Sequence, residues 1–498
     1  QYNTAVGAEA LTNNTTASSN TAVGYQSLLD NSTGTQNVAV GASALANNTT
    51  ASNNVAVGMQ TAFSTTTGGN NIAMGKQALY YNTTGTSNVA IGHVAMHLNT
   101  TANNNVSVGY RAGYSTTTGD QNTFVGTESG DAINTGRRNT VLGSFSLTTD
   151  TKGSYSVAVG YGALNAQNFT SSTEAYNTAV GSLAGAAITT GIKNTFLGGL
   201  TGDATTTGFE NVAVGYDALG TNTVGSHSVA IGPSALRSQN YGSATNAYNT
   251  AVGSFAGYAI TTGINNTLIG GLAGDAITTG GSLVAVGKSS LSANTTGSRN
   301  VAVGFSALET NTTGNNNTAV GNASLEANTT GGTNAAFGRN SMLNNTTGSY
   351  NTGLGESSFV SNTTGDYNTA VGSASLRSNT TANSNTAVGY QSLYSNTTGV
   401  DNTAVGDIAL RGNTTGGNNV AVGRYAGYSG ATSNYGVFVG AQAGFNVTGD
   451  NNTAVGYQAI NNGVCTGANN TAVGYQALYD NTTGELNSAV GVNALDAN

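Results

Sequence analysis

Histidine is the side chain most often used as a general acid or base at neutral pH. The 498-residue chain contains only three, His93, His97 and His227. A Ser-His-Asp triad or a histidine metal site would have to be assembled from these three, and separate surface histidines are the interpretation we favour. Acidic Ca²⁺-binding repeats do not occur as a series. We therefore predict that the chain is not an enzyme and that it binds no metal and no cofactor.

N-x-T/S sequons recur along the chain, and each could accept an N-glycan if the source has the machinery. The recurrent Asn-Thr-Thr-Gly segment is also turn chemistry, because Asn tolerates left-handed backbone and Gly supplies positive φ at no steric cost. We favour the turn interpretation and keep glycosylation as an alternative. The sequon asparagines considered are Asn14, Asn48, Asn82, Asn294, Asn328, Asn379 and Asn413.

Tyrosine often follows the glycine of an A-V-G or S-V-G segment. Such a tyrosine, if exposed, could stack on carbohydrate or on a neighbouring chain, whereas packing between structural repeats is its ordinary role and is favoured. Paired threonines could form a flat ice-binding surface only as T-x-T, since adjacent strand residues point to opposite faces. The tyrosines are Tyr25, Tyr110, Tyr161, Tyr216, Tyr390, Tyr457 and Tyr475.

These residues belong to a dense internal repeat. The motif N-T-A-V-G or a close variant occurs 29 times, and 24 of the 28 intervals between its glycines are 17 residues long. Averaged over the repeats, the unit reads N-(T/V)-A-V-G-x-x-A-L-x-x-N-T-T-G-x-x. We call the motif glycine the anchor glycine; the series begins with Gly7, Gly24, Gly41, Gly58, Gly75 and Gly92.

The repeat predicts an all-β fold, a parallel β-solenoid (β-roll) of about 29 coils with a 17-residue repeat. Alternation in N-T-A-V-G gives a short strand with Ala on a face pressed against a second sheet, so each coil should hold two strands and two turns. The motif Asn, present in 25 of 29 units, can hydrogen-bond its amide to the Asn above and below and form a ladder. The ladder begins with Asn3, Asn20, Asn37, Asn54, Asn71, Asn88 and Asn105.

Residues 1–498 are predicted to form one continuous repeat domain, an extended rod. The stretch 156–215 is echoed at 228–287, and the one 21-residue step in each copy predicts a tolerated edge loop. Because the chain starts at Gln1 with no charged-then-apolar segment, we expect a removed leader or a longer protein. One such coil buries too little apolar surface to offset the entropy of ordering it, which favours self-association along the rod.

The amino-acid composition of the chain limits the kinds of partner that it could bind. Charged residues make up 7% and the net charge is −8, with no basic stripe, so nucleic acid is not an expected partner. No apolar run is long enough to predict a membrane span. Cys465 is the single cysteine, so the chain cannot form a disulfide within itself.

The segments N-T-A-V-G at Asn3–Gly7, N-V-A-V-G at Asn37–Gly41 and N-V-A-I-G at Asn88–Gly92 resemble the head repeats of trimeric autotransporter adhesins. The resemblance covers nearly the whole chain as a pattern. It implies a left-handed parallel β-roll, three associated chains and an extracellular, adhesive role. The repeat here is longer than the family's usual one, and neither a coiled-coil stalk nor a membrane barrel follows it in this sequence.

The function expected from the pattern and the resemblance is an extracellular structural or adhesive fibre segment for surface attachment. Its partners would be further copies of itself, as a homotrimer, and host or matrix glycans. Two alternatives stay open. One is the shaft of a phage or virus attachment fibre on a virion surface, and the other is a ligand-binding solenoid for ice or glycan.

Overall fold

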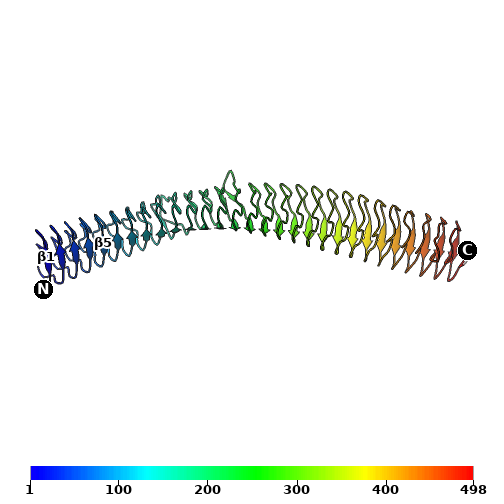
Figure 1. Ribbon diagram of the computed structural model, residues 1–498, viewed down its shortest axis with the longest axis horizontal. Helices are drawn as coiled ribbons and strands as arrows, with labels where there is room; N and C mark the ends of the chain where they lie inside the picture. Colours follow the sequence, from blue (N-terminus) through cyan, green and yellow to red (C-terminus); the bar gives the residue numbers. More distant parts are fainter. Residues whose placement is uncertain (1, 497–498) are drawn as a thin grey trace. The chain divides into compact units, whose positions relative to one another are not determined.

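The computed structural model describes residues 2–496. The chain forms two compact units, the first ending at Asn249 and the second beginning at Thr250, and both are stacks of the same coil. The described residues contain 29 three-residue strands and no helix. Within each unit, successive strands follow one another in chain order, from blue to green in the first unit and onward to red in the second (Figure 1).

The strands of the first unit are β1 (Thr4–Val6), β2 (Thr21–Val23), β3 (Val38–Val40), β4 (Val55–Val57), β5 (Ile72–Met74), β6 (Val89–Ile91), β7 (Val106–Val108), β8 (Thr123–Val125), β9 (Thr140–Leu142), β10 (Gly153–Ser154), β11 (Val157–Val159), β12 (Thr173–Glu174), β13 (Thr178–Val180), β14 (Thr195–Leu197), β15 (Val212–Val214), β16 (Gly225–Ser226), β17 (Val229–Ile231) and β18 (Thr245–Asn246).

The strands of the second unit are β19 (Thr250–Val252), β20 (Thr267–Ile269), β21 (Val284–Val286), β22 (Val301–Val303), β23 (Thr318–Val320), β24 (Ala335–Phe337), β25 (Thr352–Leu354), β26 (Thr369–Val371), β27 (Thr386–Val388), β28 (Thr403–Val405), β29 (Val420–Val422), β30 (Val437–Val439), β31 (Thr453–Val455), β32 (Thr471–Val473) and β33 (Ser488–Val490).

Pairing between neighbouring coils is parallel and places like residues on like. Thr4 pairs with Thr21, and Ala5 with Ala22, so 17 residues advance the chain by one strand. The register is also kept in the irregular coils: β11 pairs with β13 across the 21-residue step, and Ala158 lies opposite Ala179. The predicted β-solenoid of about 29 coils is therefore confirmed.

The middle strand residue points into the coil and its two neighbours point out. Ala22, Ala39 and Ala56 are fully buried, whereas the flanking residues of the same strands are partly or well exposed. The corner leucines, such as Leu28 and Leu45, fill the interior from the other side of the coil. A small middle residue is needed because these leucines share the narrow interior with it.

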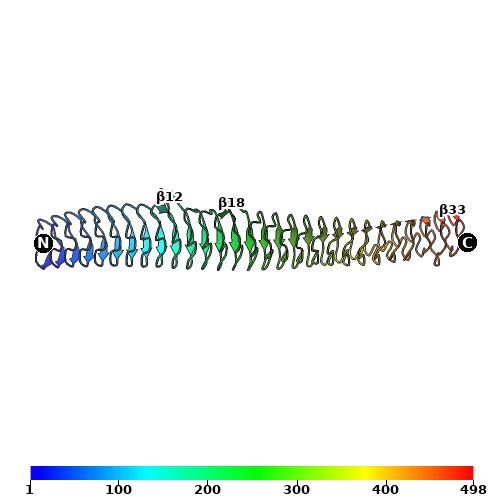
Figure 2. The same cartoon turned by 90° about the horizontal axis from the view of Figure 1, so that it is seen from above.

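The expected second strand is wrong for most coils. On the side opposite the main strand, Leu28 donates its backbone N–H to Ala44 of the next coil at 3.0 Å, as in a sheet. Leu28 nonetheless has φ 49, and Gln26 has φ 54, so left-handed residues interrupt the extended backbone. Among residues 2–496, two-residue strands form only as the pairs β10–β12 and β16–β18, which lie apart from the row of main strands (Figure 2).

The turn chemistry also differs from the expectation. The glycine of N-T-T-G and its variants, such as Gly34 in N-S-T-G, has no positive φ, and the left-handed residue comes two places later, at Gln36 with φ 60. Gly34 instead lies against the next coil, where an added Cβ would come within 2.1 Å of the Ala51 carbonyl oxygen. Close packing of coils, rather than backbone handedness, therefore accounts for a small residue at this place.

The extra residues of the 21-residue coils are more than an edge loop. In the first of these coils Thr173 and Glu174 form β12, which pairs with β10, and Phe169 is 5% exposed. Its counterpart in the second, Tyr241, is 6% exposed, and burial raises its pKa to about 12. Each longer coil thus adds an aromatic ring to the interior.

Candidate functional site

The motif asparagines form a continuous hydrogen-bonded column inside the coils. The backbone N–H of Asn20 donates to Oδ1 of Asn3 at 2.9 Å, and the Nδ2 of Asn20 donates to the Gly34 carbonyl at 2.9 Å. The ladder therefore runs mainly from backbone N–H to side-chain oxygen, and the expected amide-to-amide bonds accompany it at some steps, as where Asn88 Nδ2 donates to Asn71 Oδ1 at 3.2 Å. The same link joins each neighbouring pair among Asn3, Asn20, Asn37, Asn54, Asn71, Asn88 and Asn105.

A second column, made by the asparagines of N-T-T-G and of its variants N-S-T-G and N-T-T-A, is the clearer amide-to-amide ladder. The Nδ2 of Asn48 donates to Oδ1 of Asn31 at 2.6 Å, and the Nδ2 of Asn311 donates to Oδ1 of Asn294 at 2.8 Å. The columns satisfy polar groups that would otherwise be costly to bury. They fix one coil upon the next, and they offer no reactive group to solvent.

The sequon asparagines belong to this second column, and the folded coil leaves no room for a glycan on them. Each uses its Nδ2 to donate to the carbonyl three residues later, at 2.9 to 3.3 Å. Asn14 is partly buried and the other six are fully buried. Their burial and hydrogen bonding favour the turn interpretation over glycosylation at Asn14, Asn48, Asn82, Asn294, Asn328, Asn379 and Asn413.

The anchor glycines hold a conformation and a spacing that suit glycine alone. Across the six considered, φ lies between 123° and 137°. A Cβ added to any of them would approach the carbonyl oxygen of the next anchor glycine to 2.3–2.8 Å. These residues, Gly7, Gly24, Gly41, Gly58, Gly75 and Gly92, are structural positions where coil backbones meet.

The tyrosines that follow the anchor glycines lie on the surface. Their exposed fractions run from 46% for Tyr110 and Tyr475 to 61% for Tyr216, and Tyr25, Tyr161, Tyr390 and Tyr457 fall between. Tyr457 and Tyr475 stack with ring centroids 5.6 Å apart, and Tyr161 meets Phe145 edge to face at 5.9 Å. At these exposures each phenol remains open to a ligand or another chain.

Beside this tyrosine row runs a surface formed by the first and third residues of the main strands, here named the outer strand face; the third residue is apolar in each main strand, and the first is apolar in some strands and Thr or Ser in the others. Its large side chains are partly open to solvent. Exposed members are Val57, Ile72, Met74, Ile91, Leu142, Leu197 and Ile231 in the first unit, and Ile269, Phe337, Val405, Val420, Val422 and Val439 in the second. An apolar row of this length is unusual on a free surface and marks a place for association.

His93 follows anchor Gly92 in the tyrosine row, with its ring centroid 5.7 Å from that of Tyr110, whereas His97 and His227 join other aromatic and charged columns. His97 lies in a stack of rings formed by Phe63, Tyr80, His97 and Tyr114, with successive centroids 5.2 to 5.3 Å apart. His227 places Nε2 3.1 Å from Glu210, which also pairs with Lys193. Within residues 2–496, no group of three or more His, Cys, Asp or Glu side chains is arranged to hold a metal ion.

A buried acid sits in one of the amide columns. Asp150 takes the place of the column asparagine and is fully buried, accepting hydrogen bonds from the backbone N–H of Gly153 and from Nε2 of Gln167 at 2.7 Å. Burial raises its pKa, although these donors oppose the shift. At the 72-residue offset that relates the two duplicated stretches, just before each of them, Asn222 holds the equivalent place, so Asp150 is a variant of a structural residue.

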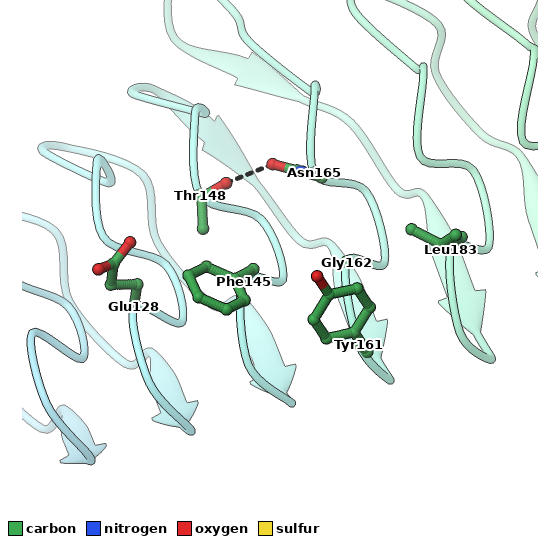
Figure 3. A pocket seen from close by; sticks show the side chains of 7 residues that line it. All are labelled: Glu128, Phe145, Thr148, Tyr161, Gly162, Asn165 and Leu183. Carbon is green, nitrogen blue, oxygen red and sulfur yellow. Dashed lines mark hydrogen bonds between the residues drawn. The ribbon is translucent and has the colours of Figure 1, made fainter.

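The first unit also carries a surface pocket of about 310 Å³, lined by Glu128, Phe145, Thr148, Tyr161, Gly162, Asn165 and Leu183. Figure 3 shows these side chains coming from four successive coils, with Gly162 between Phe145 and Leu183. Sequence reasoning named Tyr161 but missed the pocket around it. The signal was Gly162, since residues with side chains such as Gln26 and Gln391 stand two places after other anchor glycines.

Among the residues that the structure describes, no helix has the length and apolar character to cross a membrane. Comparison with known proteins found neither a matching family model nor a matching curated protein.

Proposed function

We propose that this chain is an extracellular structural and adhesive fibre segment whose copies associate, as a homotrimer, through the outer strand face. The single observation that carries the proposal is that apolar row, repeated coil after coil and partly open to solvent. Burying it against further copies would remove apolar surface from water at roughly 25 cal/mol per Å². The low charge of the chain, 7% of residues, opposes such contact little.

The interior supports a structural role. Its asparagine columns make coil-to-coil hydrogen bonds, such as Asn37 to Asn20 and Asn311 to Asn294, and its apolar side chains are buried. A repeat of this kind contacts only its neighbours, so the number of coils can change while the contacts of each coil stay the same. This property suits a spacer. The same properties would serve the shaft of a phage or virus attachment fibre, and the surface of a cell or virion is the proposed location.

Ice binding has weaker support. The first threonine of most N-T-T-G segments uses its hydroxyl within the fold, as where Thr295 Oγ1 donates to the Thr312 carbonyl at 3.1 Å. The second, such as Thr296, is exposed and forms a single file. One open threonine per coil does not make the two-file T-x-T surface that the hypothesis requires.

The association proposal is tested on the whole chain by sedimentation equilibrium and native mass spectrometry. We expect a trimer for the wild type and dissociation for Val405→Glu/Val422→Glu, which places two charges on the outer strand face. The matched control is Thr398→Glu/Thr415→Glu, because both threonines are exposed on another side of two successive coils, those of β27 and β28. A monomeric wild type, or equal association in both variants, would refute the proposal.

A further inference from the structure

The pocket beside Tyr161 exists because one side chain is missing from a column. Phe145, Gly162 and Leu183 each stand two places after an anchor glycine in three successive coils. Phe145 and Leu183 project outward on either side, and Gly162 leaves a hollow between them (Figure 3). A Cβ on Gly162 would come within 2.8 Å of Leu183 Cδ2, so Leu183 forms one wall of this hollow.

The walls combine aromatic surface with uncommitted polar groups. Tyr161 is 56% exposed and Phe145 38%, and their rings meet at 78° with centroids 5.9 Å apart. Thr148 donates its hydroxyl to Oδ1 of Asn165, which leaves the Asn165 Nδ2 as a donor. Within the described part of the chain, neither that Nδ2 nor the Glu128 carboxylate has a hydrogen-bond or ion-pair partner.

This combination selects a class of ligand. Aromatic faces pack against the C–H surface of a sugar ring, while an amide donor and a carboxylate acceptor bind its hydroxyls. An anionic ligand would face the Glu128 carboxylate, and a wholly apolar ligand would leave both polar groups without partners. The volume of about 310 Å³ is at the small end for ligand sites, about 300–1,000 Å³, and suits one sugar unit.

We propose that the hollow at Gly162 binds one neutral sugar unit, with Tyr161 and Phe145 against the ring and with Asn165 and Glu128 on its hydroxyls. The inference deepens the adhesive part of the proposed function by naming one glycan site. It does not depend on the chain's association, because all the lining residues belong to one chain and none lies on the outer strand face.

The duplicated stretch provides an internal comparison, because its equivalent position lacks the hollow's lining residues. In the duplicated stretch the places of Tyr161, Gly162 and Asn165 are taken by Pro233, Ser234 and Arg237. There Arg237 pairs with Asp217 and occupies the surface with an ion pair. The other six surface tyrosines are each followed by a residue with a long or charged side chain, so only Tyr161 has the open place beside it; those residues are Gln26, Arg111, Asp217, Gln391, Gln458 and Gln476.

Saturation-transfer difference NMR on the whole chain tests the site with D-glucose, D-galactose, D-mannose and N-acetyl-D-glucosamine as neutral probes. N-acetylneuraminic acid serves as the anionic probe and tetramethylammonium as the cationic one. We expect transfer to at least one neutral sugar, and weaker or no transfer to the other two probes.

Gly162→Gln fills the hollow with the residue found after other anchor glycines, where Gln26 and Gln391 adopt φ 54 and 50 against 64 at Gly162. We expect this variant to keep the fold and to weaken binding about tenfold or more. Tyr161→Ala should also keep the fold and weaken sugar binding. Tyr390→Ala is the matched control and should bind the sugar as the wild type does.

The proposal is overturned if no neutral sugar receives saturation, if Gly162→Gln and Tyr161→Ala bind as well as the wild type, or if only tetramethylammonium or the acidic sugar binds. Each of these results would leave the association measured by sedimentation untouched, so failure of the sugar site and failure of the fibre proposal are distinguishable.

Discussion

Replacing Phe196 by alanine should destabilise the coils around β14 by about 3–5 kcal/mol. Phe196 is the middle residue of its strand and is fully buried, at a place where most coils carry alanine. Two glycines make room for the ring: a Cβ on Gly202 would lie 2.6 Å from it and one on Gly185 2.9 Å. Without the ring, these glycines leave a cavity that the tightly hydrogen-bonded coils cannot collapse to fill.

The volume argument predicts compensation. Most coils pair a middle alanine with a corner leucine, and Leu219, in the same place as Gly202 one coil later, has φ 57, equal to that of Gly202. Gly202→Leu in the wild type should therefore overpack against the ring and cost about 1–3 kcal/mol. In the Phe196→Ala background the same leucine should fill the cavity, giving a favourable coupling of at least about 1 kcal/mol.

Native-state hydrogen exchange followed by mass spectrometry is the suitable assay, because a long repeat array does not unfold in one step and local stability must be measured. Peptides covering residues 181–219 should lose protection in each single variant and regain it in the double variant. Peptides of the second unit are the internal control. If Gly202→Leu costs the same with and without Phe196, the reasoning about shared interior volume is wrong.

Three further predictions concern single positions. Burial raises the folded pKa of Asp150, so the stabilisation by this group is complete below its unfolded pKa and is lost as pH rises towards the folded pKa. Between pH 3 and 7 the melting temperature of the wild type should therefore fall relative to that of Asp150→Asn. Parallel curves of melting temperature against pH would contradict this prediction. Gly304→Ala should lower the stability of the fold by at least about 1–3 kcal/mol, because φ is 140° and the Gly321 carbonyl oxygen would lie 2.4 Å from the added Cβ. Chemical unfolding curves measure the loss, and Gly271→Ala is the control, because its added Cβ meets nothing within 4 Å. Equal curves for the two variants would count against the steric argument. Asn345→Ala should lower local exchange protection by about 1–3 kcal/mol, since it leaves the buried Oδ1 of Asn328 and Nδ2 of Asn362 without partners in the column; undiminished protection at the adjoining turns would show that the column adds no stability.

The coil length, the parallel register and the buried alanines could be predicted from the sequence, because a hydrophobic period and an invariant anchor glycine translate directly into stacking. The side of the coil opposite the strand could not. Leu28 and Gln26 carry no intrinsic preference for positive φ, and they adopt it because their backbone N–H groups find partners in the adjacent coils. Hydrogen bonds between coils decide the left-handed backbone conformation on this side, and the intrinsic propensities of the residues do not predict it.

The interior exceptions could have been found by reading columns together. Four coils place a large residue in the alanine column, Phe124, Phe196, Leu268 and Phe438, and each is flanked by two glycines in the leucine column. The pocket at Gly162 is the same kind of signal on the outer surface. Which polar groups stay unpartnered around it, such as the Asn165 Nδ2, depends on side-chain geometry that no repeat pattern encodes.

The central claim is that seventeen residues advance the backbone by one strand spacing. Spin labels on Cys465→Ala protein, at Thr296 paired with Thr364 and at Thr296 paired with Thr398, place exposed threonines four and six coils apart in one unit. Pulsed electron paramagnetic resonance should give narrow distances near 19 Å and 29 Å, since each coil adds about 4.8 Å. Broad distributions, or a separation that does not grow by one strand spacing per repeat, would contradict the account.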